Sequence, residues 1–219
     1  MNVLLPKSPF VYNNGAAVVE GNFLYIYRPV DFNELMYALT YEIYREDMRC
    51  FYCGEPLLLE KQRTLDHRLP VDLGGPTLTN NLVPTCRRCN STKGNLTEEQ
   101  FKKFMKFGSP EEAKLYRINV EKGHKEIRHG KKILPKEWLC PPEYTLNVIK
   151  MRMHVDVPLG RGYNSIKRKY NKYGAILRPV IISANKELLD GFNVCLFAKS
   201  HNCWEKVSII KLDNVVTMY

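Results

Sequence analysis

Residues 50–95 read CFYCGEPLLLEKQRTLDHRLPVDLGGPTLTNNLVPTCRRCNSTKGN, and the rest of the chain is organised around this stretch. It contains two Cys-x-x-Cys pairs, Cys50 with Cys53 and Cys86 with Cys89. A tight turn inside each pair can point both sulfurs at one spot, so the two pairs can supply four thiolates to one tetrahedral zinc ion. The insert between the pairs is longer than in an ordinary zinc ribbon, which leaves room for a small subdomain.

The cysteine pattern has two alternative interpretations, a pair of disulfides and a set of four buried thiols. Disulfides require an oxidising compartment, and we see no secretory segment that would send the chain there. The spacing therefore favours a structural zinc ion, whose binding energy would be folding energy for a segment with little core of its own. The other cysteines, Cys140, Cys195 and Cys203, show no paired spacing and are expected to be reduced thiols.

The segment between the cysteine pairs is predicted to fold as two strands, and a helix follows them. Residues 64–67 form a short strand that ends in Asp66 and His67. The Gly-Gly-Pro sequence at residues 74–76 is a turn signal, and the segment after it returns the chain to the second cysteine pair. A short helix then begins near Asn90, so we expect Asp66, His67 and Asn90 to lie close together.

This pattern resembles the HNH endonuclease family, the ββα-metal nucleases, in the version with a zinc-binding Cys-x-x-Cys pair on each side. The residues that carry the resemblance are Asp66-His67, Gly74-Gly75, Asn81-Leu82, Cys86-x-x-Cys89-Asn90 and Lys93-Gly94. The matching stretch covers about a fifth of the chain. One position departs from the commonest family pattern, because Asn90 stands where a histidine is usual. An amide oxygen is a weaker metal ligand than an imidazole.

The resemblance implies a role for each polar residue of the site. His67 would be the general base, which suits its ordinary pKa near neutrality. Asp66 and Asn90 would hold one Mg²⁺ or Mn²⁺ ion through hard oxygen atoms, and Asn81 would orient the loop that follows His67. That ion would contact the scissile phosphate and the leaving 3′ oxygen. The alternative for an isolated Asp-His pair is a surface salt link.

The composition indicates a polyanionic partner. The chain of 219 residues has a formal net charge of +10, a sequence pI of about 9.2 and an ordinary hydrophobic content of 44%. Most of the positive excess lies C-terminal to residue 95. The basic residues that we expect to contact nucleic acid are Arg87, Arg88, Lys93, Lys167, Arg168, Lys169 and Lys172. A run of charges is otherwise usually a solvated face.

Four segments follow from the pattern. They are residues 1–49, an N-terminal hairpin and helix; residues 50–123, the nuclease core with flanking helices; residues 124–147, a basic linker; and residues 148–219, a C-terminal domain. In the first segment, Gly21 and Asn22 predict a two-residue hairpin turn, and a helix is expected from Asp31 to about Asp47. The flanking helices are expected to end near Gly123.

The C-terminal segment is predicted to alternate strands and helices. A β-rich stretch at residues 148–157 precedes a basic helix that opens at Asn164, and later strands flank a helix that begins at Phe192. The order resembles the ParB-like nuclease and sulfiredoxin fold, on Ser165-Ile166, Gly174, Pro179-Val180-Ile181-Ile182 and Leu189-Asp190-Gly191. Because no His or Arg pair follows Asp190 and Gly191, we expect a domain that grips DNA or selects the substrate, without a second active site.

The sequence thus predicts an α+β protein, a zinc-stapled HNH core with a C-terminal ParB-like α/β domain. Its expected activity is metal-dependent endonucleolytic cleavage of DNA, as a nick or a double-strand break, in the cytoplasm of a bacterial or phage-infected cell. The alternatives are a non-catalytic zinc-dependent DNA-binding protein and an RNA-directed or RNA-cleaving enzyme. No apolar run is long enough to span a bilayer, and the oligomeric state cannot be read from the pattern.

Overall fold

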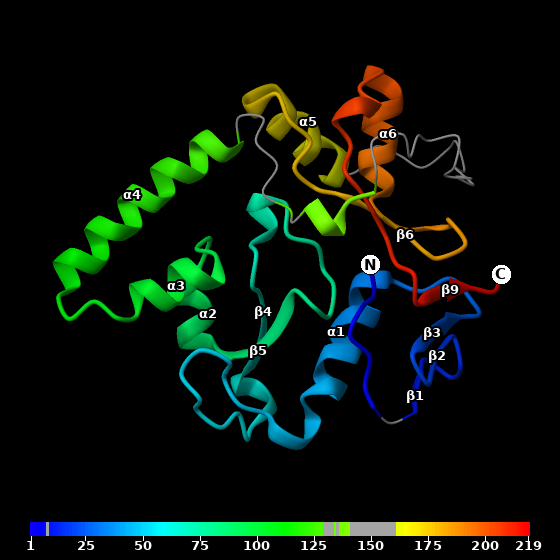
Figure 1. Cartoon of the computed structure of the whole chain (residues 1–219), viewed down its shortest axis with the longest axis horizontal. Coiled ribbons are helices and arrows are strands. Elements are labelled where there is room, and N and C mark those ends of the chain that lie inside the picture. Colours follow the sequence, from blue (N-terminus) through cyan, green and yellow to red (C-terminus); the bar gives the residue numbers. More distant parts are fainter. Residues whose placement is uncertain (8, 129–133, 135, 141–160) are drawn as a thin grey trace.

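The computed structural model describes residues 1–7, 9–128, 134, 136–140 and 161–219, and it mixes helices with three small sheets (Figure 1). At its centre lies the predicted arrangement of two strands and a helix. Strand β4 (Arg63–His67) pairs antiparallel with β5 (Leu82–Cys86), and helix α2 (Arg87–Lys93) follows β5 directly. The register runs from Arg63 opposite Cys86 to His67 opposite Leu82, so the two polar residues end the strand as expected.

The N-terminal segment forms a sheet that a C-terminal strand completes. The strands are β1 (Phe10–Tyr12), β2 (Ala17–Glu20), β3 (Phe23–Ile26) and β9 (Val215–Thr217), in that spatial order. Glu20 pairs with Phe23, which confirms the two-residue turn at Gly21 and Asn22. Strand β9 pairs parallel with β3 and was not predicted. Residues near the two ends of the sequence therefore share one sheet.

Helix α1 (Phe32–Ile43) begins at the expected cap, because the Asp31 side chain accepts hydrogen bonds from the backbone of Asn33 and Glu34. It ends earlier than predicted, and a short 3₁₀ turn takes over the last residues. The described 3₁₀ turns are η1 (Arg45–Asp47), η2 (Glu60–Gln62), η3 (Val71–Leu73), η4 (Lys136–Trp138) and η6 (Trp204–Lys206).

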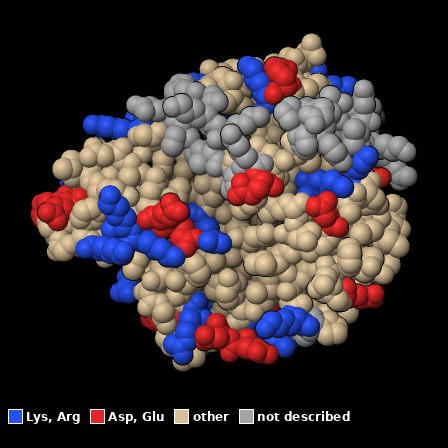
Figure 2. Space-filling view, in the orientation of Figure 1, with Lys and Arg blue, Asp and Glu red and all other residues tan. Residues whose placement is uncertain are grey.

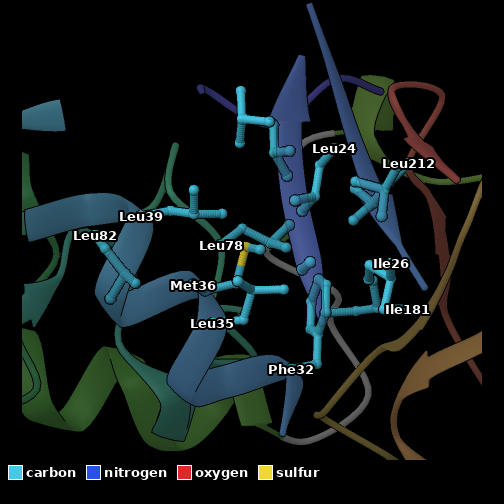
Figure 3. Close-up of a cluster of buried hydrophobic side chains, with 14 of the residues drawn as sticks. Leu24, Ile26, Phe32, Leu35, Met36, Leu39, Leu78, Leu82, Ile181 and Leu212 are labelled. Carbon is cyan, nitrogen blue, oxygen red and sulfur yellow. The ribbon is translucent and has the colours of Figure 1, made fainter. Parts of the chain in front are cut away.

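One hydrophobic core joins three of the predicted segments (Figure 3). Leu35 and Leu39 of α1 are fully buried and face Leu24 of β3. Leu82 of β5 and Leu212, which follows β8, are buried in the same cluster. Burying each such side chain contributes roughly 1.5–3 kcal/mol. Described residues from the first, second and fourth predicted segments thus share one core, and the division into domains stays a prediction.

The C-terminal part has the predicted order of elements after residue 160. The elements are helix α5 (Arg161–Tyr173), strands β6 (Val180–Ile182) and β7 (Leu188–Asp190), helix α6 (Phe192–His201) and strand β8 (Ile209–Lys211). The sheet order is β7-β6-β8, with β6 parallel to β8. Helix α5 begins at Arg161, three residues before the predicted Asn164. The β-rich stretch at residues 148–157 lies outside the described residues, and the resemblance to a ParB-like domain is not confirmed.

Helices α3 (Glu98–Phe104) and α4 (Pro110–Arg128) follow the central unit, and α4 runs along the side of the molecule towards α5 (Figure 1). Thr97 and Gln100 form the predicted capping box of α3. The expectation that residues 124–147 begin a linker is wrong for residues 124–128, which continue α4. The reason is burial, because His124 is 2% exposed and its Nε2 lies 2.9 Å from Oε1 of Gln100. Residues 129–133, 135 and 141–147 lie outside the described part.

Two surface properties bear on a partner. In the view of Figure 2, lysine and arginine side chains lie interspersed with acidic ones, so this face shows mixed charge. Among the residues that the structure describes, none of the helices has the length and apolar character needed to cross a bilayer.

Candidate active site and metal centre

The four cysteines of the two Cys-x-x-Cys pairs come together. Their sulfur atoms all lie within 4.8 Å of one another, and Sγ of Cys53 is 3.9 Å from Sγ of Cys86. A tetrahedral zinc ion with zinc–sulfur bonds of about 2.3 Å separates its sulfurs by about 3.8 Å. The cluster is thus slightly wider than a zinc site and needs only a small contraction. The donor set fits structural zinc, since all four ligand positions would be filled by thiolates.

Local backbone geometry explains how each pair presents its sulfurs. Cys86 ends β5 and caps α2, where its sulfur accepts a hydrogen bond from the N–H of Cys89 at 3.4 Å. In the first pair, the N–H of Gly54 donates to the carbonyl of Cys50 at 2.8 Å. Gly54 has a φ of +72°, a conformation that glycine adopts without strain. Each pair is therefore a tight turn, as its spacing predicts.

The thiol pKa values within the cluster diverge. Burial opposes ionisation of Cys50, but backbone groups of Cys86, Cys53 and Tyr52 hydrogen-bond to it and lower its pKa to about 7. Burial raises the pKa of Cys89, and its contacts with the other sulfurs raise it further. Without a cation, four sulfurs this close favour a state with one thiolate and three protonated thiols, because a second negative charge would repel the first. A metal cation would remove that restriction.

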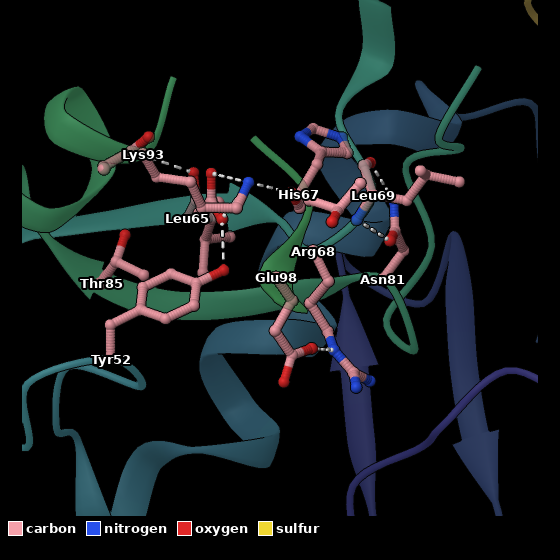
Figure 4. Close-up of polar contacts among 12 residues, drawn as sticks. Tyr52, Leu65, His67, Arg68, Leu69, Asn81, Thr85, Lys93 and Glu98 are labelled. Atoms are coloured by element: carbon pink, nitrogen blue, oxygen red, sulfur yellow. Dashed lines mark hydrogen bonds and ion pairs between the residues drawn. The ribbon is translucent and has the colours of Figure 1, made fainter. Parts of the chain in front are cut away.

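Asp66 is a buried carboxylate with two donors (Figure 4). Lys93 Nζ lies 3.0 Å from Oδ2 of Asp66, and the Tyr52 hydroxyl donates to the same oxygen at 2.8 Å. The side chain of Lys93 is fully buried, and its ammonium also donates to the carbonyl of His67 at 2.8 Å. Burial raises the pKa of Asp66, although Lys93 opposes the shift, and burial lowers the pKa of Lys93. The ion pair is therefore costly to bury and costlier still to break.

His67 lies on the other side of β4 from Asp66, as alternation along a strand requires. Its Nε2 is 3.1 Å from Oγ1 of Thr77. Burial lowers the pKa of His67 to about 4, and the charges of Lys93 and Arg178 add to the shift. The imidazole is consequently neutral at pH 7, which is the form in which it can accept a proton.

Asn90 is held against β4 by its amide nitrogen. Nδ2 donates to Oγ1 of Thr64 at 3.1 Å and to the carbonyl of Leu65 at 3.2 Å. Both bonds use the nitrogen, so Oδ1 is the atom left for a cation. The structure thus brings Asn90 and Asp66 to the same helix–strand unit, where α2 contacts β4 through both Asn90 and Lys93. A carboxylate and an amide oxygen suit a hard divalent ion, but the Lys93 ammonium holds the carboxylate here.

Asn81 fastens the loop after His67. Its Oδ1 accepts from the N–H of Leu69 at 2.9 Å, and its Nδ2 donates to the carbonyls of Leu69 and Pro76 at 3.1 and 2.9 Å. Gly75 lies under the same loop, where a Cβ atom would be 1.8 Å from the Leu69 carbonyl oxygen. The backbone of the loop therefore wraps the buried Asn81 amide, and only glycine at position 75 leaves room for the Leu69 carbonyl. This contact fits the orienting role that the resemblance implies for Asn81.

The predicted nucleic-acid contacts separate into three groups. Arg87 and Arg88 are exposed at the start of α2. Lys93 does not fit the prediction, because its side chain is buried on Asp66. On α5, the exposed residues are Lys167, Arg168 and Lys172, while Lys169 is half-buried and lies 2.9 Å from Oδ1 of Asp72. The pairing of Lys93 was missed, because a lysine after a helix turn usually points to solvent.

Sequence reasoning also missed Tyr52 and Thr77, which contact Asp66 and His67. Tyr52 stands inside the first Cys-x-x-Cys pair, and its ring packs edge-on to Phe101 of α3 at a centroid distance of 4.9 Å. Its position inside the cysteine turn was the available signal, because a residue there cannot point far from the metal cluster. Thr77 carries no such signal, since its contact depends on the path of the glycine loop.

Comparison with known proteins identifies the central unit. Residues 50–106 match the family model of the HNH endonucleases. Besides the family match of this HNH segment, a stretch of 54 residues of the chain is 41% identical to the CRISPR-associated endonuclease Cas9 of Corynebacterium diphtheriae. The match covers 24% of this chain and 5% of that protein, so the two share one segment of limited length. The family match confirms the resemblance drawn from the sequence for this segment.

Proposed function

We propose that the chain is a metal-dependent HNH endonuclease that hydrolyses phosphodiester bonds in DNA. The observation that carries the proposal is the HNH segment, whose two strands and helix bring Asp66, His67 and Asn90 to one short unit beside a four-cysteine cluster. The positive net charge supports a polyanionic substrate.

The residues divide the chemistry among them. His67 takes a proton from the attacking water, and Thr77 and the Asn81-fastened loop fix its ring. Asp66 and Asn90 would hold one Mg²⁺ or Mn²⁺ ion, which when bound supplies positive charge for the scissile phosphate and the leaving oxygen. The four cysteines would hold a structural zinc ion that keeps α2 in register with β4. Arg87 and Arg88 are exposed for contacts with the phosphate backbone.

The protonation state of His67 supports a base. With a pKa of about 4 the imidazole is neutral across the physiological range, because burial and two cations disfavour the imidazolium. A pKa this low also makes a weak base. A bound phosphate would add negative charge near the ring and raise the pKa towards the working pH.

Two observations favour a non-catalytic DNA-binding protein. The Lys93 ammonium already neutralises Asp66, at 3.0 Å and within the buried interior. A chain that had lost metal binding would show this contact. Asn90 in place of the usual histidine points the same way, because it lowers the ligand strength of the site.

Plasmid cleavage separates the two candidates. The purified zinc-loaded protein is incubated with supercoiled plasmid in Mg²⁺ or Mn²⁺, beside the His67→Ala variant and an EDTA control. The proposal expects nicked or linear DNA from the wild type only, with equal DNA binding by both proteins. Binding without cleavage in either metal would assign the non-catalytic role, and equal cleavage by the variant would remove His67 as the base. Matched RNA and DNA duplexes then test the alternative of an RNA-cleaving enzyme.

A further inference from the structure

A segment from the C-terminal part of the chain lies against the loop that follows His67. A Cβ atom added at Gly74 would be 2.6 Å from the backbone oxygen of Leu177, which is closer than real Cβ atoms approach. Gly74 also has a φ of +94°. Two stretches far apart in the sequence therefore meet backbone to backbone, and the residue after Leu177 is Arg178.

Polar contacts hold α5 and the end of α4 to the same loop. Asp72 of η3 accepts from Lys169 Nζ at 2.9 Å and from Asn95 Nδ2 at 3.2 Å. Nη2 of Arg128 lies 3.9 Å from the same carboxylate. The bonds from Lys169 and Asn95 hold the pKa of Asp72 below its ordinary value, with Arg128 adding to the effect. Asp72 thus contacts three side chains, and its bond with Lys169 holds α5 beside the HNH segment.

The Arg178 side chain is held in one direction by Asp190. Its Nη2 lies 2.8 Å from Oδ2 of Asp190, whose other oxygen accepts the N–H of Gly191 at 2.7 Å. The Arg178 side chain is 46% exposed, and only Nη2 is engaged by Asp190. Arg178 follows Leu177 directly, so its side chain starts from the segment that touches the loop after His67.

A cavity of about 280 Å³ opens beside Arg178. It is bordered by Val71 of the HNH loop, by Lys169 of α5 and by Asn193 at the start of α6. Two cations line it, and its one carboxylate, Asp190, is already paired with Arg178. Lys169 is paired with Asp72. The donors left for a ligand are therefore those of Arg178 that Asp190 does not engage, and the polar Asn193 amide is at the wall. Such a lining suits an anionic group on a sugar-phosphate chain.

We propose that Arg178 contacts a substrate phosphate next to the scissile one, and that Asp190 positions its guanidinium. The inference rests on the proposed nuclease function and adds a residue from outside the HNH segment to its substrate site. A guanidinium offers a planar fork of donors that matches two phosphate oxygens. The alternative is a surface ion pair that only holds β7 to the segment before β6. Loss of such a pair would have the same effect whatever the charge of the substrate.

The test removes charge from one side of the contact at a time. Zinc-loaded full-length wild type, Arg178→Gln and Arg178→Lys are compared on a duplex whose cleavage position has been mapped. Neutral methylphosphonates replace single phosphates on either side of that position. Arg45→Gln is the matched control, because Arg45 of η1 also forms an ion pair, with Glu42 of α1 at 3.1 Å, and its side chain is likewise partly exposed. Thermal unfolding checks that every variant is folded.

The contact predicts a non-additive pattern. Arg178→Gln should lower kcat/KM about 10- to 100-fold, as expected for a charge-assisted hydrogen bond, Arg178→Lys should fall between, and Arg45→Gln should stay within about twofold. One methylphosphonate should cost the wild type a similar factor and cost Arg178→Gln nothing further. Losses that multiply at every flanking position, or unchanged cleavage by Arg178→Gln, would overturn the inference.

Binding is measured in EDTA on a set of duplexes that carries one methylphosphonate at each position in turn. This assay needs no mapped cleavage position, so it separates this inference from the proposed function. If the wild type binds with the same non-additive dependence on Arg178 but never cleaves, the phosphate contact stands and the nuclease assignment falls. If it cleaves and no position shows non-additivity in either assay, the contact falls and the nuclease stands.

Discussion

Replacing Lys93 by methionine should destabilise the protein far more than an ordinary lysine substitution. The side chain is fully buried, and its ammonium lies 3.0 Å from Asp66 and 2.8 Å from the His67 carbonyl. Methionine fills nearly the same volume but leaves the Asp66 carboxylate buried with only the Tyr52 hydroxyl for a partner. Breaking a buried pair in this way costs about 3–5 kcal/mol. That is a large part of the roughly 5–15 kcal/mol by which folded proteins are stable.

The measurement is urea unfolding of the zinc-loaded protein at pH 7 in EDTA-free buffer without Mg²⁺. Lys102→Met is the matched control, because Lys102 pairs with Glu98 on the surface and its loss should cost no more than about 1 kcal/mol. Adding Asp66→Asn to Lys93→Met should recover stability, since the stranded charge is then gone. These three proteins separate the loss of a charge partner from the loss of packing.

A divalent ion provides a second reading of the same site. Mg²⁺ or Mn²⁺ at 100 times its dissociation constant stabilises the folded state by about 2.7 kcal/mol. At one fixed ion concentration we expect a larger gain for Lys93→Met than for the wild type, because the ion need not displace an ammonium from Asp66 and so binds more tightly. The reasoning is refuted if the free energy of unfolding of Lys93→Met lies within about 1 kcal/mol of the wild-type value. It is also refuted if the ion raises this free energy equally in both proteins.

Three further outcomes are expected. Burial lowers the pKa of His67 in the folded protein to about 4, from an ordinary value of 6.5. Its contribution of up to about 3 kcal/mol to the free energy of unfolding is therefore present above pH 6.5 and is lost as the pH falls towards 4. The difference in this free energy between wild type and His67→Gln should shrink over that range, and a constant difference would contradict the burial argument. Cys86→Ser should lose bound zinc and folding stability together, by metal analysis and thermal unfolding, while Cys140→Ser keeps both; a stable, zinc-free Cys86→Ser protein would count against the metal centre. Gly75→Ala should cost several kcal/mol because its Cβ meets a backbone oxygen at 1.8 Å, whereas Gly108→Ala, with nothing within 4 Å, should change stability by about 0.5 kcal/mol or less; similar unfolding midpoints for the two would show that the loop yields.

The local elements of the HNH segment were predictable because each carries its own signal. The cysteine spacing and the glycine turn predict β4, β5 and α2 within a few residues. The capping box at Thr97 and the hairpin turn at Gly21 were predicted from side-chain chemistry that acts over three or four residues. Elements of this kind depend on neighbours in the sequence, so one sequence suffices to find them.

Contacts between distant residues were not predictable in this way. The pairing of β9 with β3 depends on two apolar triplets that look like many others in the chain. Lys93 was interpreted as a phosphate contact because nothing local shows that its helix turns inward onto Asp66. Arg178 lies beside the loop that follows His67 only because the segment at Leu177 packs on Gly74. In each case a tertiary contact decides what a charge or a strand does.

The parallel pairing of β3 with β9 has a consequence for synthesis. Leu24 lies opposite Val215, so about 190 further residues must be synthesised after β3 before its partner strand β9 is available. At about 5–20 residues per second, a nascent chain keeps this strand edge open for roughly ten to forty seconds. Open edges pair readily with other chains, and contacts so far apart also slow folding. A nascent chain stalled before residue 215 would therefore expose the unpaired edge of β3, and chaperones that shield such edges should bind to it.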